Sequence, residues 1–122
     1  MIIGTGIDIV QNKRIAKIFK KFGEKFSKKI MGDKLWNGQK ANSTNLSACF
    51  ASKEAFVKAL GTGFTNSITF HNINIMHNSQ GKPYIKLTGE ANKLSKKLNI
   101  TNIHLSISHE REYTVAMVIL EK

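Results

Sequence analysis

The strongest constraint on the fold lies near the C-terminus, where residues 113–120 form an almost unbroken apolar run. The run is rich in β-branched side chains and has the length of a strand, so we expect a strand that is buried on both faces. Just before it, Ile103, Leu105 and Ile107 alternate with polar residues, which indicates a half-buried strand. A loop of four residues separates the two segments. The sequence therefore predicts a C-terminal antiparallel hairpin.

Two longer stretches have the spacing of amphipathic helices. Gly23 weakens the first helix or breaks it. The second helix is expected to take Ser43 or Asn45 as its N-cap and to end at Gly61, since glycine often follows a helix C-terminus. The apolar positions are Ile15, Ile18, Phe19, Phe22, Phe26 and Ile30 in the first helix, and Leu46, Phe50, Val57 and Leu60 in the second.

Shorter elements occupy the rest of the chain. Residues 2–10 and 68–76 are predicted strands, the second with a bulge between Phe70 and Ile73. Thr88 is expected to cap a short helix after a strand at residues 84–87. Because strands and helices do not alternate regularly, the pattern favours an α+β fold with an antiparallel sheet. A length of 122 residues suits one domain, spanning residues 1–122.

Charge and cysteine content narrow the function classes. The formal net charge is +11, and residues 13–34 hold nine basic side chains against Glu24 and Asp33. Codon usage can explain a general lysine excess but not this cluster, so we expect an acidic partner: nucleic acid, acidic membrane or acidic protein. Cys49 is the only cysteine, which excludes an intrachain disulfide and a Cys-rich metal site. No signal peptide or transmembrane-length apolar run is evident, so the expected location is cytoplasmic, away from membranes.

Four charged residues are candidates for chemistry. Asp8 lies inside the apolar run Gly6-Ile7-Asp8-Ile9-Val10, where it must pair, cap a helix or bind a cation. Glu54 and Lys58 stand four apart on the second helix, a spacing that an ordinary surface ion pair also explains. Lys53 falls on the apolar stripe of that helix, so it either extends along the surface to reach solvent or projects into a site.

The C-terminal strand offers two further candidates. His109 follows Ser108 at the start of a loop and is either solvated or functional. Neighbouring residues on a strand point to opposite faces, so the two cannot act as a hydrolytic pair. The turn at Gly61-Thr62-Gly63, with lysines nearby, could hold phosphate oxygens, although it follows a helix and is no P-loop.

Four motifs in order give the chain a resemblance to a known family. They are Gly6-Ile7-Asp8-Ile9-Val10 with Arg14 close behind; Phe50-Ala51-Ser52-Lys53-Glu54-Ala55 continuing to Lys58-Ala59-Leu60-Gly61-Thr62-Gly63; Gly81-Lys82-Pro83; and Ile107-Ser108-His109-Glu110 followed by Tyr113, Ala116 and Val118. Together they resemble the holo-[acyl-carrier-protein] synthases, the single-domain bacterial phosphopantetheinyl transferases. The resemblance covers essentially the whole chain.

The resemblance implies a fold, an assembly and a reaction. The fold is the pseudo-symmetric phosphopantetheinyl transferase fold, in which an antiparallel sheet packs on a long helix, and the assembly is a homotrimer with active sites between subunits. The reaction moves 4′-phosphopantetheine from coenzyme A to a serine of apo acyl carrier protein in fatty acid biosynthesis, releasing 3′,5′-ADP with the help of Mg²⁺. A carrier domain of another system, such as polyketide synthesis, stays an alternative substrate.

The resemblance also assigns roles to residues. Asp8 and Glu54 are expected to bind Mg²⁺, with Glu54 accepting the serine proton directly or through a metal-bound water; a metal-bound hydroxide is the alternative base. Lys58 is expected to stabilise or protonate the leaving phosphate. The residues expected to contact coenzyme A are Lys40, Lys53, Lys58, Gly61, Ser108 and His109, and those expected to contact the carrier protein are Arg14, Lys17 and Lys21.

One departure from the family pattern concerns coenzyme A binding. The family usually has arginine immediately before the phenylalanine of its central motif, and here that position is Cys49. We therefore expect Lys40 to take a larger share of the nucleotide contact. If the pocket keeps the family's shape, Cys49→Arg should tighten coenzyme A binding. The rival to the whole interpretation is a nucleic-acid-binding module, but the phenylalanines of the first helix lie on its apolar stripe and no zinc-finger or RNP-like motif is present, so no nucleic-acid partner is expected.

Overall fold

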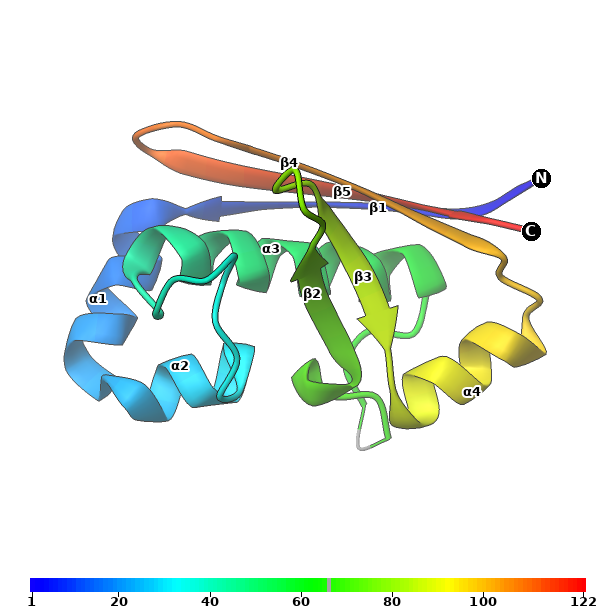
Figure 1. Cartoon of the computed structure of the whole chain (residues 1–122), viewed down its shortest axis with the longest axis horizontal. Coiled ribbons are helices and arrows are strands. Elements are labelled where there is room, and N and C mark those ends of the chain that lie inside the picture. The colour runs from blue at the N-terminus through cyan, green and yellow to red at the C-terminus, as the bar shows by residue number, and fades with distance from the viewer. Residues whose placement is uncertain (66) are drawn as a thin grey trace.

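The computed structural model describes residues 1–65 and 67–122. A three-stranded antiparallel sheet lies over the longest helix, α3, and its strand order is β1-β5-β4 (Figure 1). The predicted α+β class, with an antiparallel sheet packed on a long helix, is confirmed. These four elements are β1 (Ile2–Gln11), α3 (Ser43–Leu60), β4 (Asn102–His109) and β5 (Tyr113–Glu121).

The remaining elements pack on the side of α3 that faces away from this sheet (Figure 1). Helices α1 and α2 lie near the beginning of α3, and a second, two-stranded antiparallel sheet of β2 and β3 crosses its middle. None of the helices described is long and apolar enough to cross a bilayer. The bounds are α1 (Asn12–Phe22), α2 (Glu24–Met31), the 3₁₀ turn η1 (Phe70–Asn72), β2 (Ile73–His77), β3 (Pro83–Leu87) and α4 (Gly89–Lys97).

Two glycines let β1 lie directly against α3. A side-chain Cβ at Gly4 would overlap the carbonyl oxygen of Ala59, and one at Gly6 would overlap that of Ala55. Glycine is needed where two backbones approach this closely. The Gly-x-Gly spacing before Asp8 therefore holds the next residues of β1 at the surface of α3.

The ends of α3 follow the expected chemistry with one correction. Its N-cap is Asn42, not Ser43 or Asn45: the side-chain oxygen of Asn42 accepts a hydrogen bond from the Asn45 backbone N–H at 2.9 Å. Asn45 completes a capping box by accepting from the Asn42 N–H at 2.8 Å. The stop at Gly61 is confirmed, since this residue adopts a left-handed conformation with φ of 80°.

Gly23 breaks the first helix into α1 and α2, one of the two outcomes expected. Two other local predictions differ from the structure. The strand predicted from residue 68 begins only at Ile73, and the apparent bulge is the 3₁₀ turn η1. Thr88 precedes α4 as expected, but its side chain makes no capping hydrogen bond.

The largest surprise is the outer face of the sheet. On β5, Thr114, Ala116, Val118 and Leu120 are buried against α3, whereas the alternate residues face outward, and 43% of Met117 is exposed. The prediction that this strand is buried on both faces is therefore wrong within a single chain. Neighbouring β1 adds Ile7 and Ile9 to the same face, each more than 60% exposed. A contiguous apolar surface of this kind usually marks an interface.

Candidate active site

The first group of predicted residues meets where β1 crosses α3. Asp8 pairs with Ala116 of β5, so its side chain points to the inner side of the sheet, toward α3. The Lys58 ammonium donates to Oδ1 of Asp8 at 2.9 Å and to the Ile7 carbonyl at 3.0 Å. Lys58 thus pairs with Asp8 across the two elements, a contact that the sequence spacing of Glu54 and Lys58 does not indicate.

The negative charge of the two carboxylates, Asp8 and Glu54, is only partly compensated by neighbouring groups. Oδ2 of Asp8 is buried and has no hydrogen-bond partner among the described residues. Burial raises the pKa of Glu54, and the neighbouring Asp8 charge raises it further, while Lys58 opposes the shift. An unpaired buried carboxylate oxygen is costly, so a cation bound beside it would stabilise the site.

The donor set suits one class of metal. In the part of the chain that the structure describes, no group of three or more histidine, cysteine or carboxylate side chains is poised around one point. Mg²⁺ typically takes one or two protein carboxylates and completes its shell with water and substrate phosphates. Asp8 and Glu54 therefore fit Mg²⁺ bound together with a phosphorylated substrate.

Lys53 lies elsewhere. Only 3% of this residue is exposed, and its ammonium donates to the carbonyls of Ile30 at 2.6 Å and Phe70 at 2.9 Å. Burial lowers the pKa of Lys53. The side chain ties the end of α2 to η1, and the structure does not bring it to Asp8 and Glu54.

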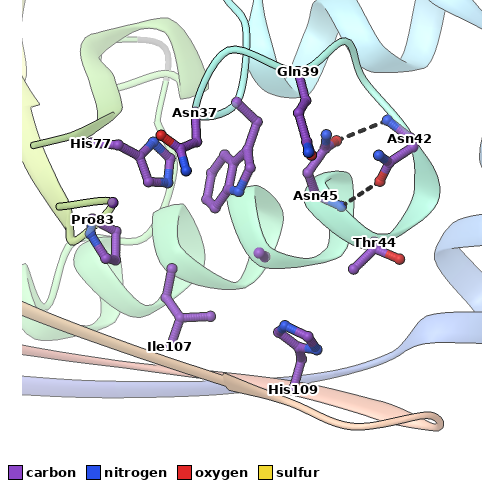
Figure 2. Close-up of a pocket in the computed structure, with 12 residues that line it drawn as sticks. Asn37, Gln39, Asn42, Thr44, Asn45, His77, Pro83, Ile107 and His109 are labelled. Atoms are coloured by element: carbon purple, nitrogen blue, oxygen red, sulfur yellow. Dashed lines mark hydrogen bonds between the residues drawn. The ribbon is translucent and has the colours of Figure 1, made fainter. Parts of the chain in front are cut away.

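A pocket of about 340 Å³ lies on the other flank of α3 (Figure 2). His109 lines it from the end of β4, together with Ile107. Ser108 pairs with Val115, whose side chain belongs to the outer face of the sheet, so the structure separates Ser108 from His109. This separation follows from the alternation of side chains along a strand.

The two other residues expected to contact coenzyme A lie outside the pocket lining. Lys40 is exposed beside the pocket, and its backbone carbonyl accepts a hydrogen bond from the Asn45 side-chain amide at 2.8 Å. Gly61 is exposed at the far end of α3. Asp8, Glu54 and Lys58 thus lie apart from His109 and Lys40, and Lys53, Ser108 and Gly61 belong to neither group.

The sheet keeps these two groups apart within one chain. Strands β1 and β4 are the two edges of the sheet, with β5 between them. Asp8 on β1 and Ile107 on β4 both pair with Ala116 of β5, from opposite sides. The carboxylates therefore flank α3 on one side and the pocket flanks it on the other.

The predicted carrier-binding residues lie on α1. Arg14 and Lys17 line a surface hollow of about 550 Å³ together with Lys13 and Lys20. Lys21 is exposed at the end of the same helix, with its ammonium 5.3 Å from the centre of the Phe22 ring. The basic cluster is thus a continuous, accessible surface on α1.

Comparison with known proteins identifies the family. The sequence profile of the 4′-phosphopantetheinyl transferase superfamily matches residues 4–118. The chain belongs to this superfamily. A holo-[acyl-carrier-protein] synthase of Vibrio cholerae is 44% identical over all of the chain and 99% of the relative, and one of Halothermothrix orenii is 45% identical over the same shares.

Solved structures of transferases from this superfamily agree. The holo-[acyl-carrier-protein] synthase of Neisseria meningitidis is 36% identical, with a TM-score of 0.89 over the full length of both chains. The Helicobacter pylori enzyme, crystallised with coenzyme A, is 32% identical over 96% of this chain and 99% of that one, with a TM-score of 0.85. The resemblance drawn from the motifs is confirmed.

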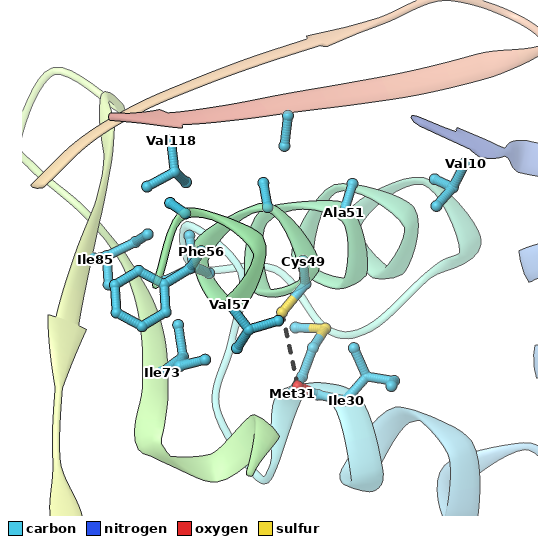
Figure 3. Packing of buried hydrophobic residues seen from close by; sticks show 14 of the residues in the cluster. Val10, Ile30, Met31, Cys49, Ala51, Phe56, Val57, Ile73, Ile85 and Val118 are labelled. Atoms are coloured by element: carbon cyan, nitrogen blue, oxygen red, sulfur yellow. Dashed lines mark hydrogen bonds between the residues drawn. The ribbon is translucent and has the colours of Figure 1, made fainter. Parts of the chain in front are cut away.

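The surroundings of Cys49 in this transferase show what a larger side chain at this position would meet. It is buried between α3 and α2, with Sγ 3.8 Å from the Ile30 carbonyl (Figure 3). Burial raises the pKa of its thiol to about 11, opposed by the nearby Lys53 charge. An arginine at this position would have to displace packed side chains. Cys49→Arg is therefore expected to cost stability, and its effect on coenzyme A binding stays a prediction.

Sequence reasoning missed most of the pocket. Trp36 and His77 form part of its wall, with ring centroids 4.6 Å apart and planes at 74°. The dipeptide Asn37-Gly38 was an available signal, because it is the preferred sequence for a tight hairpin turn. Nothing in the sequence, however, shows that this turn lies next to β2 and β4.

Proposed function

We propose that the protein is a holo-[acyl-carrier-protein] synthase, which transfers 4′-phosphopantetheine from coenzyme A to a serine of apo acyl carrier protein and releases 3′,5′-ADP. The observation that carries the proposal is the pair Asp8 and Glu54, with an unpartnered buried carboxylate oxygen, in a chain that matches holo-[acyl-carrier-protein] synthases over its full length. The reaction belongs to fatty acid biosynthesis. The free thiol of Cys49 fits a reducing, cytoplasmic location.

Asp8 and Glu54 are the residues that would hold Mg²⁺ in this enzyme. When bound, the ion neutralises charge on the pyrophosphate of coenzyme A and on the transition state. The Lys58 ammonium compensates one oxygen of Asp8, at 2.9 Å, and so lies beside the place where a metal-bound phosphate would sit. We assign it to the leaving phosphate, which it stabilises or protonates.

The transfer is a displacement at the β-phosphorus of coenzyme A. The carrier serine oxygen forms a bond to this phosphorus, and the bond from the phosphorus to the oxygen of the 5′-phosphate breaks. Glu54 accepts the serine proton, directly or through a water. In the absence of the ion, burial and the Asp8 charge raise the pKa of Glu54, and Lys58 opposes the shift.

The enzyme is proposed to act as a homotrimer with its active sites between subunits. Two features support this assembly. The carboxylates and the pocket lie on opposite flanks of α3, and neighbouring copies could bring one of each to a single coenzyme A. The exposed apolar face formed by Ile7, Ile9 and Met117 gives the copies a surface on which to associate.

The carrier protein is proposed to dock on α1. Acyl carrier proteins are acidic, and Arg14 and Lys17 line a basic hollow that is open to solvent. Lys21 extends this surface toward the end of the helix. Charges at the rim of an interface steer the encounter of the two proteins more than they hold the complex together.

Mass spectrometry of apo acyl carrier protein tests the function directly. Incubation with the enzyme, coenzyme A and Mg²⁺ should add the mass of one phosphopantetheine to the carrier, and Asp8→Asn should abolish the addition. A Lys96→Ala variant, altered on the exposed side of α4, is the matched control and should keep the activity. An unmodified carrier, together with binding to random-sequence DNA that survives moderate salt, would favour a nucleic-acid-binding module instead.

A further inference from the structure

The wall of the pocket is a rigid hairpin that belongs to none of the four motifs. The backbones of Trp36 and Gln39 exchange two hydrogen bonds, of 2.8 and 2.9 Å. Between them, Asn37 and Gly38 have φ of 48° and 82°. Positive φ at both central residues defines the tight turn that Asn-Gly prefers. The turn therefore fixes the backbone position of Trp36 relative to the pocket.

The Trp36 ring is held in place from one side and open to the pocket on the other. It is half-buried, packs against the edge of the core, and meets the His77 ring edge to face. Burial lowers the pKa of His77, so this imidazole stays neutral at neutral pH. Together the two rings form an uncharged aromatic wall, which is the surface on which a planar heterocycle stacks.

Side-chain amides surround this wall. Asn37, Gln39 and Asn45 line the same pocket, and Figure 2 shows them opposite Ile107 and His109. Each amide can donate and accept hydrogen bonds, as the edge of a nucleobase does. No lysine, arginine, aspartate or glutamate is among the described residues that line the pocket. The lining therefore suits an uncharged aromatic ring with polar edges better than it suits a phosphate.

We propose that Trp36 binds the adenine base of coenzyme A and sets the affinity of the enzyme for the nucleotide half of its substrate. The proposal rests on the proposed function for the identity of the nucleotide. Cys49, which stands where the family motif usually has arginine, is buried and does not line the pocket. Affinity for the base then comes from stacking on Trp36 and from contacts with the side-chain amides.

The experiment uses Trp36 as its own reporter, because it is the only tryptophan in the chain. The assembled enzyme is titrated with 3′,5′-ADP at pH 8, where His77 is neutral, and binding is followed by tryptophan emission and by calorimetry. Emission should change as the site fills. Trp36→Ala should raise the Kd for 3′,5′-ADP roughly tenfold or more, whereas Trp36→Phe should change it much less. Ribose 3,5-bisphosphate, which has no base, should bind far more weakly and leave the emission unchanged.

Leu35→Ala is the matched control. Leu35 is the neighbour of Trp36, is 56% exposed and does not line the pocket, so its removal should leave the Kd unchanged. Equal affinity of wild type and Trp36→Ala overturns the proposal, as does equal affinity for 3′,5′-ADP and ribose 3,5-bisphosphate. If Trp36→Ala does not fold, saturating 3′,5′-ADP that leaves wild-type emission unchanged overturns it as well.

The test of the Trp36 contact can fail or succeed independently of the test of the transferase activity. If 3′,5′-ADP binding depends on Trp36 but the wild type leaves the apo carrier protein unmodified, the base contact stands and the transferase assignment fails. If transfer proceeds and Trp36→Ala keeps the wild-type KM for coenzyme A, the transferase assignment stands and the base contact fails.

Discussion

The two flanks of α3 were built in different ways, and the difference explains what each contributes. On the β1 flank, Asp8, Glu54 and Lys58 come from one strand and one helix, and the Gly-x-Gly contact fixes how these elements meet. On the β4 flank, the pocket is assembled from a loop hairpin, the β2–β3 turn and a strand end. Regular elements hold reacting groups precisely, whereas loops vary more readily and so adjust affinity.

The largest effect is expected on the first flank. Asp8→Asn and Glu54→Gln each remove one charge from the cation site, so turnover should fall by about 100-fold or more. The fold should survive, because both side chains lie at the edge of the core, and an unchanged melting temperature without ligand would check this. Mn²⁺ should replace Mg²⁺ with activity retained, since both take octahedral oxygen ligands. Near-normal turnover of either variant at saturating Mg²⁺ would show that the metal assignment is wrong.

The relation between the flanks can be tested by mixing defective copies. Asp8→Asn damages one flank and Trp36→Ala the other, so each variant alone should be impaired at low coenzyme A concentration. If each site takes its two flanks from neighbouring copies, trimers refolded from both variants contain some sites with both flanks intact. Activity should then exceed the average of the two separate variants. A mixture that shows only the average would mean that each site draws on one copy.

The apolar face supplies the matching control for that experiment. Met117→Lys places a charge in the middle of the exposed face without altering either flank. The variant should therefore be monomeric, and it should be inactive for the same reason. Lys96→Ala on α4 should alter neither property. Sedimentation gives the mass of each variant. If the Met117→Lys protein stays trimeric, the interface between copies does not lie on this face.

The sequence predicted the first flank far better than the second. Asp8 stood out because a carboxylate inside an apolar strand demands a partner, and Glu54 stood out through its motif. Trp36 lies in a loop hairpin and His77 at the end of β2, and no periodicity encodes how the hairpin packs on that strand. The exposure of β5 was missed for a related reason: an apolar strand signals burial, but not whether the covering surface comes from the same chain.

Cys49 is a position where the structure adds a stability cost that the sequence did not indicate. Cys49→Arg is predicted to improve coenzyme A binding, and the side chain it replaces is buried beside Ile30 and Lys53. Forcing a larger, charged group into this packing should cost about 1–3 kcal/mol of unfolding free energy. Urea denaturation measures the loss. In the wild type, the pKa of about 11 keeps the thiol protonated at pH 8, so iodoacetamide should label only unfolded protein.

The smallest effect is expected at the docking surface, which belongs to neither flank. Reversing Arg14 and Lys21 to glutamate should raise the KM for carrier protein a few-fold and flatten its dependence on salt, because these exposed charges act by steering and are screened by ions. The KM for coenzyme A should stay constant, since neither side chain lines the pocket. Reversing Lys96 and Lys97 on α4 changes the net charge equally and controls for a general loss of positive charge. If both pairs of substitutions raise the KM for carrier protein equally, the attraction comes from the overall charge and α1 is no specific docking surface. If only the α1 pair raises this KM, the carrier protein docks on α1.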